Sequence, residues 1–111
     1  MIDDLKLYKE TYDFLLWLYP EIKKFPKSEK YTLGERLKNT TESLLLNIVL
    51  INKNKSKQEY LKKADLDLGL LRILLRLSSD LKVMPFKKYE IASKKVNDMG
   101  NLLGGLIKTF K

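Results

Sequence analysis

The chain has 111 residues, neither cysteine nor histidine, and a formal net charge of +8. Disulfide bonds, zinc sites built from cysteine and histidine, and catalysis by either residue are therefore excluded. Hydrophobic residues make up 44% and charged residues 32% of the sequence. This composition predicts one globular domain, residues 1–111, with enough chain to bury a core.

The first ten residues, MIDDLKLYKE, are acidic and lack the apolar run of a signal or transit peptide. No apolar run approaches the roughly 18–20 residues that are needed to span a bilayer. We therefore expect a cytoplasmic protein without a membrane partner.

Apolar residues recur at helical spacing along almost the whole chain, and no useful length alternates with period two. Four helices are predicted, at about residues 3–24, 33–52, 56–81 and 85–110. Pro26 ends the first helical segment, and Pro85 suits the first turn of the last. Short connections between long helices predict an all-α, up-down-up-down antiparallel four-helix bundle.

Two segments have the pattern of a capping box, Thr32 with Glu35 and Ser56 with Glu59. In such a box the hydroxyl accepts a hydrogen bond from the backbone amide three residues on, and the carboxylate reaches back to the cap. We expect both boxes to start helices, and we expect removal of the Thr32 cap to cost about 1 kcal/mol.

The first helix carries two apolar rows, although a helix in a simple bundle needs only one. The row that we expect to face the core contains Leu5, Tyr8, Tyr12, Leu15, Leu16, Tyr19 and Ile22. The second row contains Leu7, Phe14, Leu18 and Phe25.

The third helix also has two rows. Its expected core row contains Leu61, Ala64, Leu68, Leu71, Leu74 and Leu75, and its second row contains Leu66, Ile73 and Leu77. Soluble monomers rarely expose apolar patches of this size. We therefore predict a homo-oligomer whose interfaces contain the second rows of both helices. The alternative is a thick core with scattered exposed leucines.

Two arginines, Arg72 and Arg76, lie one turn apart in the most apolar helix, on a stripe with Asp65 and Gly69. They have two possible roles: ion pairs with acids such as Asp65 or those of a neighbouring subunit, or binding of phosphate groups. The glycine suggests a close approach by another backbone or a ligand. Asp67 lies nearer the core and would need a polar partner.

Positive charge is unevenly distributed, with net −3 over residues 1–22, +7 over 23–63 and +4 over 64–111. This asymmetry favours a polyanionic partner, although a solvated lysine-rich surface is the simpler explanation. In an antiparallel bundle the first and third loops lie at the same end, which gathers Lys23, Lys24, Lys27, Lys30, Lys82, Lys87 and Lys88. The opposite end gathers Lys53, Lys55, Lys57, Lys62, Lys63, Lys108 and Lys111.

The candidate residues for binding nucleic acid or a protein partner are therefore Lys23, Lys24, Lys27, Lys30, Arg36, Arg72, Arg76, Lys82, Lys87 and Lys88. Tyr31 and Tyr89 lie near this set and are able to stack on bases, although core packing is the simpler role. The sequence contains no nucleophile with an evident base, no facing pair of carboxylates and no Glu-x-x-His pair for a diiron site. We predict no catalytic residue, no metal and no cofactor.

The stretch LYPEIKKFPKSEKYTLGERL, followed by an apolar helix, resembles the four-helix-bundle superfamily of the 23S rRNA intervening-sequence proteins. The resemblance is closer to the accessory variability determinant (Avd) of diversity-generating retroelements. The motifs that carry it are WLYP at residues 17–20 and the pattern AD…LR…LR from Ala64 to Arg76. The segment RLKNTTESLLLNIVLIN lacks the proline and the AEG ending that are typical of the intervening-sequence branch.

The resemblance to Avd implies a homopentameric barrel of four-helix protomers with a basic surface. It also implies association with the reverse transcriptase of the retroelement and with template RNA or other nucleic acid. Arg72 and Arg76 match the arginines of the third helix in that family. Two alternatives remain: an intervening-sequence protein of unknown role, and a purely structural helical oligomer whose charge serves solubility.

Overall fold

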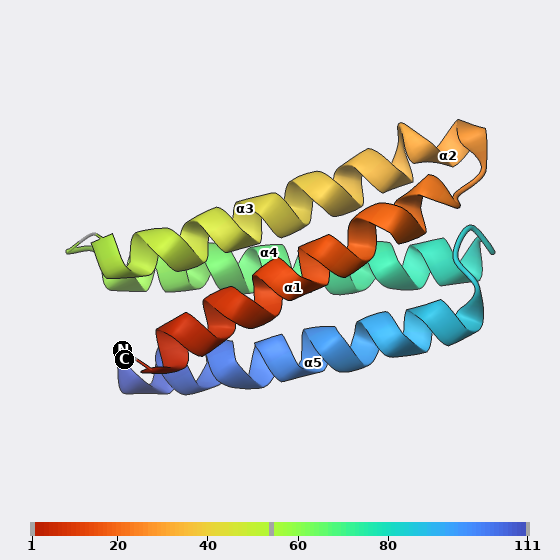
Figure 1. Ribbon diagram of the computed structural model, residues 1–111. Helices are drawn as coiled ribbons and strands as arrows, with labels where there is room; N and C mark the ends of the chain where they lie inside the picture. The colour runs from red at the N-terminus through yellow and green to blue at the C-terminus, as the bar shows by residue number, and fades with distance from the viewer. Residues whose placement is uncertain (1, 54, 111) are drawn as a thin grey trace.

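The computed structural model describes residues 2–53 and 55–110, the first three of them without their side chains (Figure 1). The lysine at position 111, assigned above to one end of the bundle, lies outside the described residues. The helices are α1 (Ile2–Lys23), α2 (Lys27–Lys30), α3 (Leu33–Lys53), α4 (Lys57–Asp80) and α5 (Phe86–Thr109). The four long helices confirm the prediction from the sequence, whereas the one-turn α2 was not predicted.

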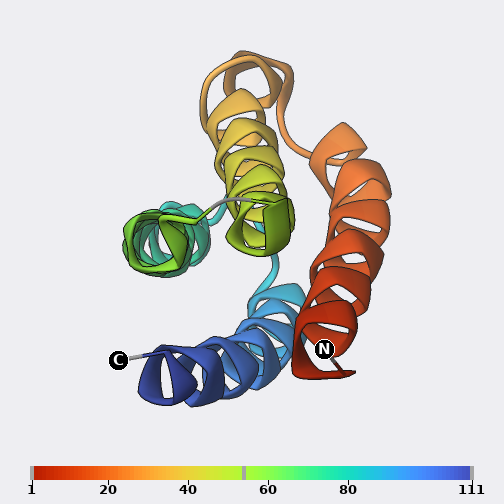
Figure 2. The same cartoon turned by 90° about the vertical axis from the view of Figure 1, so that its left-hand side faces the viewer.

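The four long helices form an antiparallel bundle of 42 × 22 × 19 Å. Helix α1 packs against α3 and α5, and α4 packs against the same two helices. Seen along the bundle, α1 and α4 therefore lie across from each other, as do α3 and α5 (Figure 2). The α1–α3 and α4–α5 connections lie at one end, as the predicted topology requires (Figure 1).

The core contains side chains from all four long helices. The predicted core row of α4 is confirmed, since its six residues, from Leu61 to Leu75, are at most 4% exposed. Helix α3 contributes Leu37, Leu44, Ile48 and Ile51, and α5 contributes Val96, Met99, Leu103 and Leu106. Among the members of the second row of α4, Leu66 and Ile73 are 67% and 64% exposed.

The rotation of α1 differs from the prediction. Leu7, Phe14 and Leu18 are at most 1% exposed and Phe25 is 4% exposed, so the prediction that these four residues form an intersubunit interface is wrong. They face the core, and the row expected there faces outward, except for the buried Ile22 and the half-buried Leu15.

The core side of α1 is difficult to recognise in the sequence because it includes a polar residue. Thr11 lies on the core side of α1, fully buried, and its hydroxyl donates a 2.8 Å hydrogen bond to the carbonyl of Leu7. A buried hydroxyl that bonds one turn back in its own helix leaves no polar group unsatisfied. The outward row instead contains three tyrosines, whose hydroxyl groups stay solvated when the rings are only partly buried.

The turn between α1 and α3 does not contain the predicted capping box. The Thr32 hydroxyl donates to the carboxylate of Glu29 at 2.8 Å and to the carbonyl of Ser28 at 3.3 Å. Glu35 forms an ion pair with Lys38 at 3.1 Å. The hydroxyl binds backward because α2 brings the Glu29 carboxylate beside it. The predicted box at Ser56 is also wrong, since Ser56 is the N-cap of α4 but makes no side-chain capping bond.

The turn between α4 and α5 is a Schellman motif. The amide of Val83 donates to the carbonyl of Ser78 at 2.8 Å, and the amide of Lys82 donates to that of Ser79 at 2.9 Å. This motif places the residue after the C-cap in the left-handed region, where glycine is preferred. Lys82 occupies that position with φ 60°.

The glycines of α3 and α4 lie in different surroundings. At Gly34 a Cβ atom would lie 2.7 Å from the Cγ2 of Ile22, so this residue permits the close approach of α1 and α3. Gly69, where the sequence suggested a close approach, has open space around it. That suggestion is not supported within the isolated chain.

Candidate nucleic-acid and partner interface

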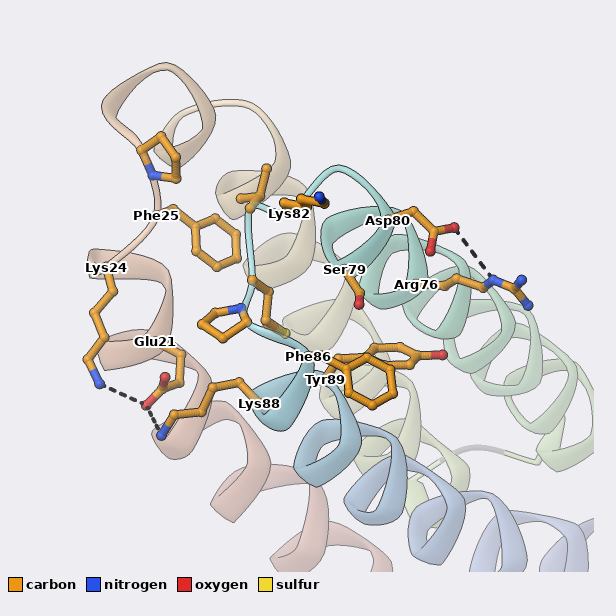
Figure 3. Close-up of a pocket in the computed structure, with 14 residues that line it drawn as sticks. Glu21, Lys24, Phe25, Arg76, Ser79, Asp80, Lys82, Phe86, Lys88 and Tyr89 are labelled. Carbon is orange, nitrogen blue, oxygen red and sulfur yellow. Dashed lines mark hydrogen bonds and ion pairs between the residues drawn. The ribbon is translucent and has the colours of Figure 1, made fainter.

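A groove of about 900 Å³ lies at the end of the bundle where α1, the α4–α5 turn and the start of α5 meet (Figure 3). Four of the predicted cations line it: Lys24, Arg76, Lys82 and Lys88. Lys24 directly follows α1, Lys82 lies in the turn and Lys88 lies in α5, so the antiparallel topology brings these three lysines together as predicted. Arg76, from α4, was not predicted to join them.

One buried acid holds two of these cations. Glu21 is 9% exposed, and its carboxylate forms ion pairs with Lys24 at 3.4 Å and with Lys88 at 3.5 Å (Figure 3). Both cations share a single negative charge, so this part of the groove keeps a net positive charge. Arg76 is paired with Asp80 at 3.6 Å, and both side chains are more than two-thirds exposed. Such an exposed pair is weak and exchanges readily with other anions.

Aromatic and apolar side chains form the rest of this groove. Phe86 is 64% exposed, and its ring lies 6.0 Å from that of the half-buried Tyr89 (Figure 3). Phe25 and Met84, which are buried, also line the groove. An exposed ring beside cations can stack on a base whose phosphate the cations contact. Phe86 was not among the site residues predicted from the sequence.

A second groove, of about 370 Å³, lies between α4 and α5 and shares Arg76 and Tyr89 with the first. It contains Arg72, whose guanidinium donates a 2.6 Å hydrogen bond to the side-chain oxygen of Asn97 and lies over Gly100. Within the part of the chain that the structure describes, no carboxylate pairs with Arg72. A neutral amide therefore orients this exposed guanidinium and leaves its charge available.

The sequence left open whether Arg72 and Arg76 pair with acids such as Asp65 or bind phosphate groups. Neither of them pairs with Asp65: Arg72 binds Asn97, and Arg76 binds Asp80. Asn97 was not predicted because its contact with Arg72 depends on the register between α4 and α5.

Other predicted residues lie at the same end of the bundle but do not line either groove. Lys23, Lys27, Arg36 and Lys87 are exposed and Lys30 is half-buried. Tyr31 is 73% exposed, so core packing does not explain it.

Asp67 has a structural role. Its carboxylate accepts hydrogen bonds from the Ser43 hydroxyl at 2.7 Å and from the Asn47 amide at 2.9 Å. These contacts join α4 to α3 and provide the polar partners that the sequence analysis expected.

Two apolar rows face outward on opposite corners of the bundle. We call them the α1 row, which contains Leu5, Tyr8, Tyr12, Leu16 and Tyr19, and the α4 row, which contains Leu66, Leu70, Ile73, Leu77 and Leu81. Leu81 is the C-cap of α4. The exposed fractions run from 40% to 68% in the α1 row and from 37% to 67% in the α4 row. Both rows are therefore uncovered in the isolated chain.

The described residues contain no cluster of three or more acidic, histidine or cysteine side chains that could hold a metal ion. A search of the same residues finds no helix with the length and hydropathy of a membrane span.

Comparison with known families identifies the family of this chain. The model of the bAvd-like family matches residues 5–110. The chain belongs to the bAvd-like family. The match covers α1 from residue 5, the whole of α3, α4 and α5, and both grooves, and it confirms the resemblance to the Avd-like accessory variability determinants. No curated protein matches the chain.

Proposed function

We propose that this bAvd-like chain is a non-catalytic accessory protein of a diversity-generating retroelement. In this role it is a basic homo-oligomer, a pentamer as in the family that it resembles, that binds the reverse transcriptase and template RNA and so supports mutagenic cDNA synthesis. The family match over residues 5–110 is the observation that carries the proposal. The net charge of +8 agrees with it, because contacts between cations and phosphates release counterions and strengthen binding to RNA.

The two connected grooves are the proposed contact surface for RNA. Lys24, Lys82 and Lys88 supply ammonium charges at the end of the bundle, two of them shared with the single charge of Glu21. Arg72 supplies a fixed guanidinium, whose planar donors suit phosphate oxygens. Phe86 supplies an exposed ring for stacking. None of these groups reads a base edge in a defined pattern, so we expect binding with little sequence preference.

The experiment compares the parent chain with two variants in which the same charge is removed at opposite ends of the bundle. The groove variant carries Lys24→Gln, Lys82→Gln and Lys88→Gln. The matched control carries Lys53→Gln, Lys62→Gln and Lys108→Gln. Glutamine keeps a hydrogen-bond donor for Glu21, and circular dichroism checks that both variants remain helical.

Binding to a single-stranded RNA oligonucleotide is measured by fluorescence anisotropy over a range of salt concentrations. We expect the groove variant to bind more weakly and its log–log salt slope to fall by about 0.7 for each phosphate that the variant no longer neutralises. The control should retain the parent slope. An equal loss of RNA affinity in both variants would mean that binding depends on the overall charge of the protein rather than on the groove.

The reverse transcriptase is tested separately, by co-purification of the parent chain with the reverse transcriptase of a diversity-generating retroelement. Parent protein that binds neither RNA nor that enzyme would refute the proposed function and leave a structural oligomer as the remaining interpretation.

A further inference from the structure

Phe86 presents an exposed ring in a basic groove. The sequence has four phenylalanines. Phe14 and Phe25 are at most 4% exposed and Phe110 is half-buried against the core, whereas Phe86 is 64% exposed. A single exposed apolar residue is common on a protein surface, so exposure alone assigns no role to this ring. The groups around the ring determine what it can bind.

Cations flank this ring. Phe86 lies at the start of α5 and lines the first groove together with Lys88 of the same helix and Arg76 of α4. Figure 3 shows the rings of Phe86 and Tyr89 between Lys88 on one side and Arg76 on the other. The two ring centres are 6.0 Å apart, and the ring planes are inclined by 43°. The aromatic pair therefore lies between positive charges that come from two different helices.

The aromatic pair also lies where the two grooves meet. Tyr89 and Arg76 line both grooves, and Arg72 lines the second. A ligand chain that follows the two grooves passes from the lysines of the first, over the rings, to the arginines of the second. A nucleic-acid strand has this succession of groups, because bases alternate with phosphates along it. An acidic peptide would match the cations, but its acidic side chains supply no flat face to stack on Phe86.

A base can reach the ring of Phe86 only where the base is unpaired. Within an RNA duplex the faces of each base are covered by the neighbouring base pairs, so that only the backbone and the base edges are accessible. Unpaired bases can leave the stack and pack on aromatic side chains, with little dependence on which base is present. A duplex can therefore contact the cations of the grooves but gains nothing from the ring.

We propose that the two connected grooves bind an unpaired nucleotide strand, with one base stacked on Phe86 and the flanking phosphates on the cations. This contact adds affinity that neither a duplex nor a bare sugar-phosphate backbone gains. The identity of the strand as template RNA rests on the proposed function, whereas the selection of unpaired bases rests on the ring and the cations beside it. A polymerase copies a template only where it is unpaired, so the contact favours the form of the RNA that is copied.

Two substitutions at one position and a matched control test the contact. Phe86→Leu keeps an apolar side chain but removes the ring, and Phe86→Trp keeps a ring. The control is Leu46→Ala, because Leu46 is 58% exposed but lies on α3 and lines neither groove. Circular dichroism checks that each variant remains helical.

Three probes of equal length are compared by fluorescence anisotropy at one salt concentration. They are a single-stranded RNA that forms no hairpin, the corresponding duplex, and a strand in which abasic units replace all nucleotides. We expect the parent to bind the single strand more tightly than the abasic strand, which carries the same charge. Phe86→Leu should bind the single strand about 5- to 100-fold more weakly and should leave the other two affinities unchanged. Phe86→Trp and Leu46→Ala should keep the parent affinity for all three probes.

Three results would overturn the proposal. Equal affinity of the parent for the single strand and the abasic strand would mean that no base is stacked, and this comparison requires no variant. A loss of affinity for all three probes in Phe86→Leu would mean that the side chain shapes the groove without selecting unpaired bases. Unchanged single-strand affinity in Phe86→Leu would place the stacking on another residue. The proposed function fails differently, because the parent would then bind none of the three probes.

Discussion

Helices α1 and α4 each carry two apolar rows, but the sequence identified the core row only in α4. In α4 the core row has more members than the outward row, so a count of apolar residues gives the correct orientation. In α1 the outward row is the longer one, and the core side includes the fully buried Thr11 and the buried Glu21. The difference shows that the number of apolar residues does not determine rotation when polar groups on the core side find partners.

Polar contacts with the neighbouring helices also fix the rotation of α4. Asp67 ties α4 to α3 through Ser43 and Asn47, and Arg72 ties it to α5 through Asn97. These two contacts flank the core row of α4 and keep its outward row turned to solvent.

In α1 the corresponding contacts involve residues near its C-terminal end. Tyr19 lies 3.5 Å from the Glu42 carboxylate of α3, and Glu21 pairs with Lys88 of α5. In both helices, polar side chains next to the core row contact the two neighbouring helices. These contacts fix the rotation of the helix that leaves its second apolar row exposed.

The largest expected effect separates the two rows of α1. Leu18 is fully buried and Leu16 is 59% exposed, yet both are leucines in the same helix. Leu18→Ala should lower the free energy of unfolding by about 2–5 kcal/mol, because it leaves a cavity in the core. Leu16→Ala should change the concentration-independent part of that free energy by less than about 0.5 kcal/mol. Urea unfolding at several protein concentrations measures both, and the reverse order of effects would restore the orientation that the sequence suggested.

Two glycine substitutions with opposite expected signs come next. Gly34→Ala should destabilise the chain by about 1–3 kcal/mol, because the added methyl meets the Ile22 side chain where α3 approaches α1. Gly69→Ala should stabilise α4 by up to about 1 kcal/mol, because nothing surrounds this glycine and alanine favours the helix. Thermal unfolding measures both variants. A destabilised Gly69→Ala variant with reduced mass would instead mean that a neighbouring copy approaches α4 at this point.

Features that depend on local patterns in the sequence could be predicted, and features that depend on contacts between helices could not. Helix ends, topology and the gathering of Lys24, Lys82 and Lys88 depend on periodicity and short loops, and these were predicted correctly. The bond from Arg72 to Asn97 and the pairing of Glu21 with two lysines depend on the register between helices. The rotation of α1 depends on where one buried hydroxyl donates. The register between helices is not determined by any pattern within a single helix, and a threonine in a sequence does not show by itself that its hydroxyl bonds within the helix and is buried.

The turn after α4 gives a smaller test. Lys82 has φ 60°, a conformation that costs a residue with a side chain roughly 1–2 kcal/mol. Lys82→Gly removes this cost but adds flexibility to the unfolded chain, so the net gain should be about 0.5 kcal/mol. Urea unfolding measures the gain. The same variant should weaken RNA binding if the lysine at the rim of the groove contacts phosphate, and Lys82→Asn, which tolerates this conformation, serves as a second uncharged variant. Reduced stability in both variants would contradict the assignment of strain to this position.

The smallest expected change in the free energy of unfolding concerns the turn after α1. A capping box at this position would predict a larger change. Because the Thr32 hydroxyl binds the exposed Glu29 carboxylate, Thr32→Ala should lower the free energy of unfolding by less than about 0.5 kcal/mol. A true cap would give about 1 kcal/mol. Double-mutant cycles separate the two arrangements. Thr32 should show a coupling of a few tenths of a kcal/mol with Glu29 and none with Glu35, because only residues in contact depart from additivity. A coupling to Glu35 alone would mean that the hydroxyl leaves α2 and caps α3 in solution.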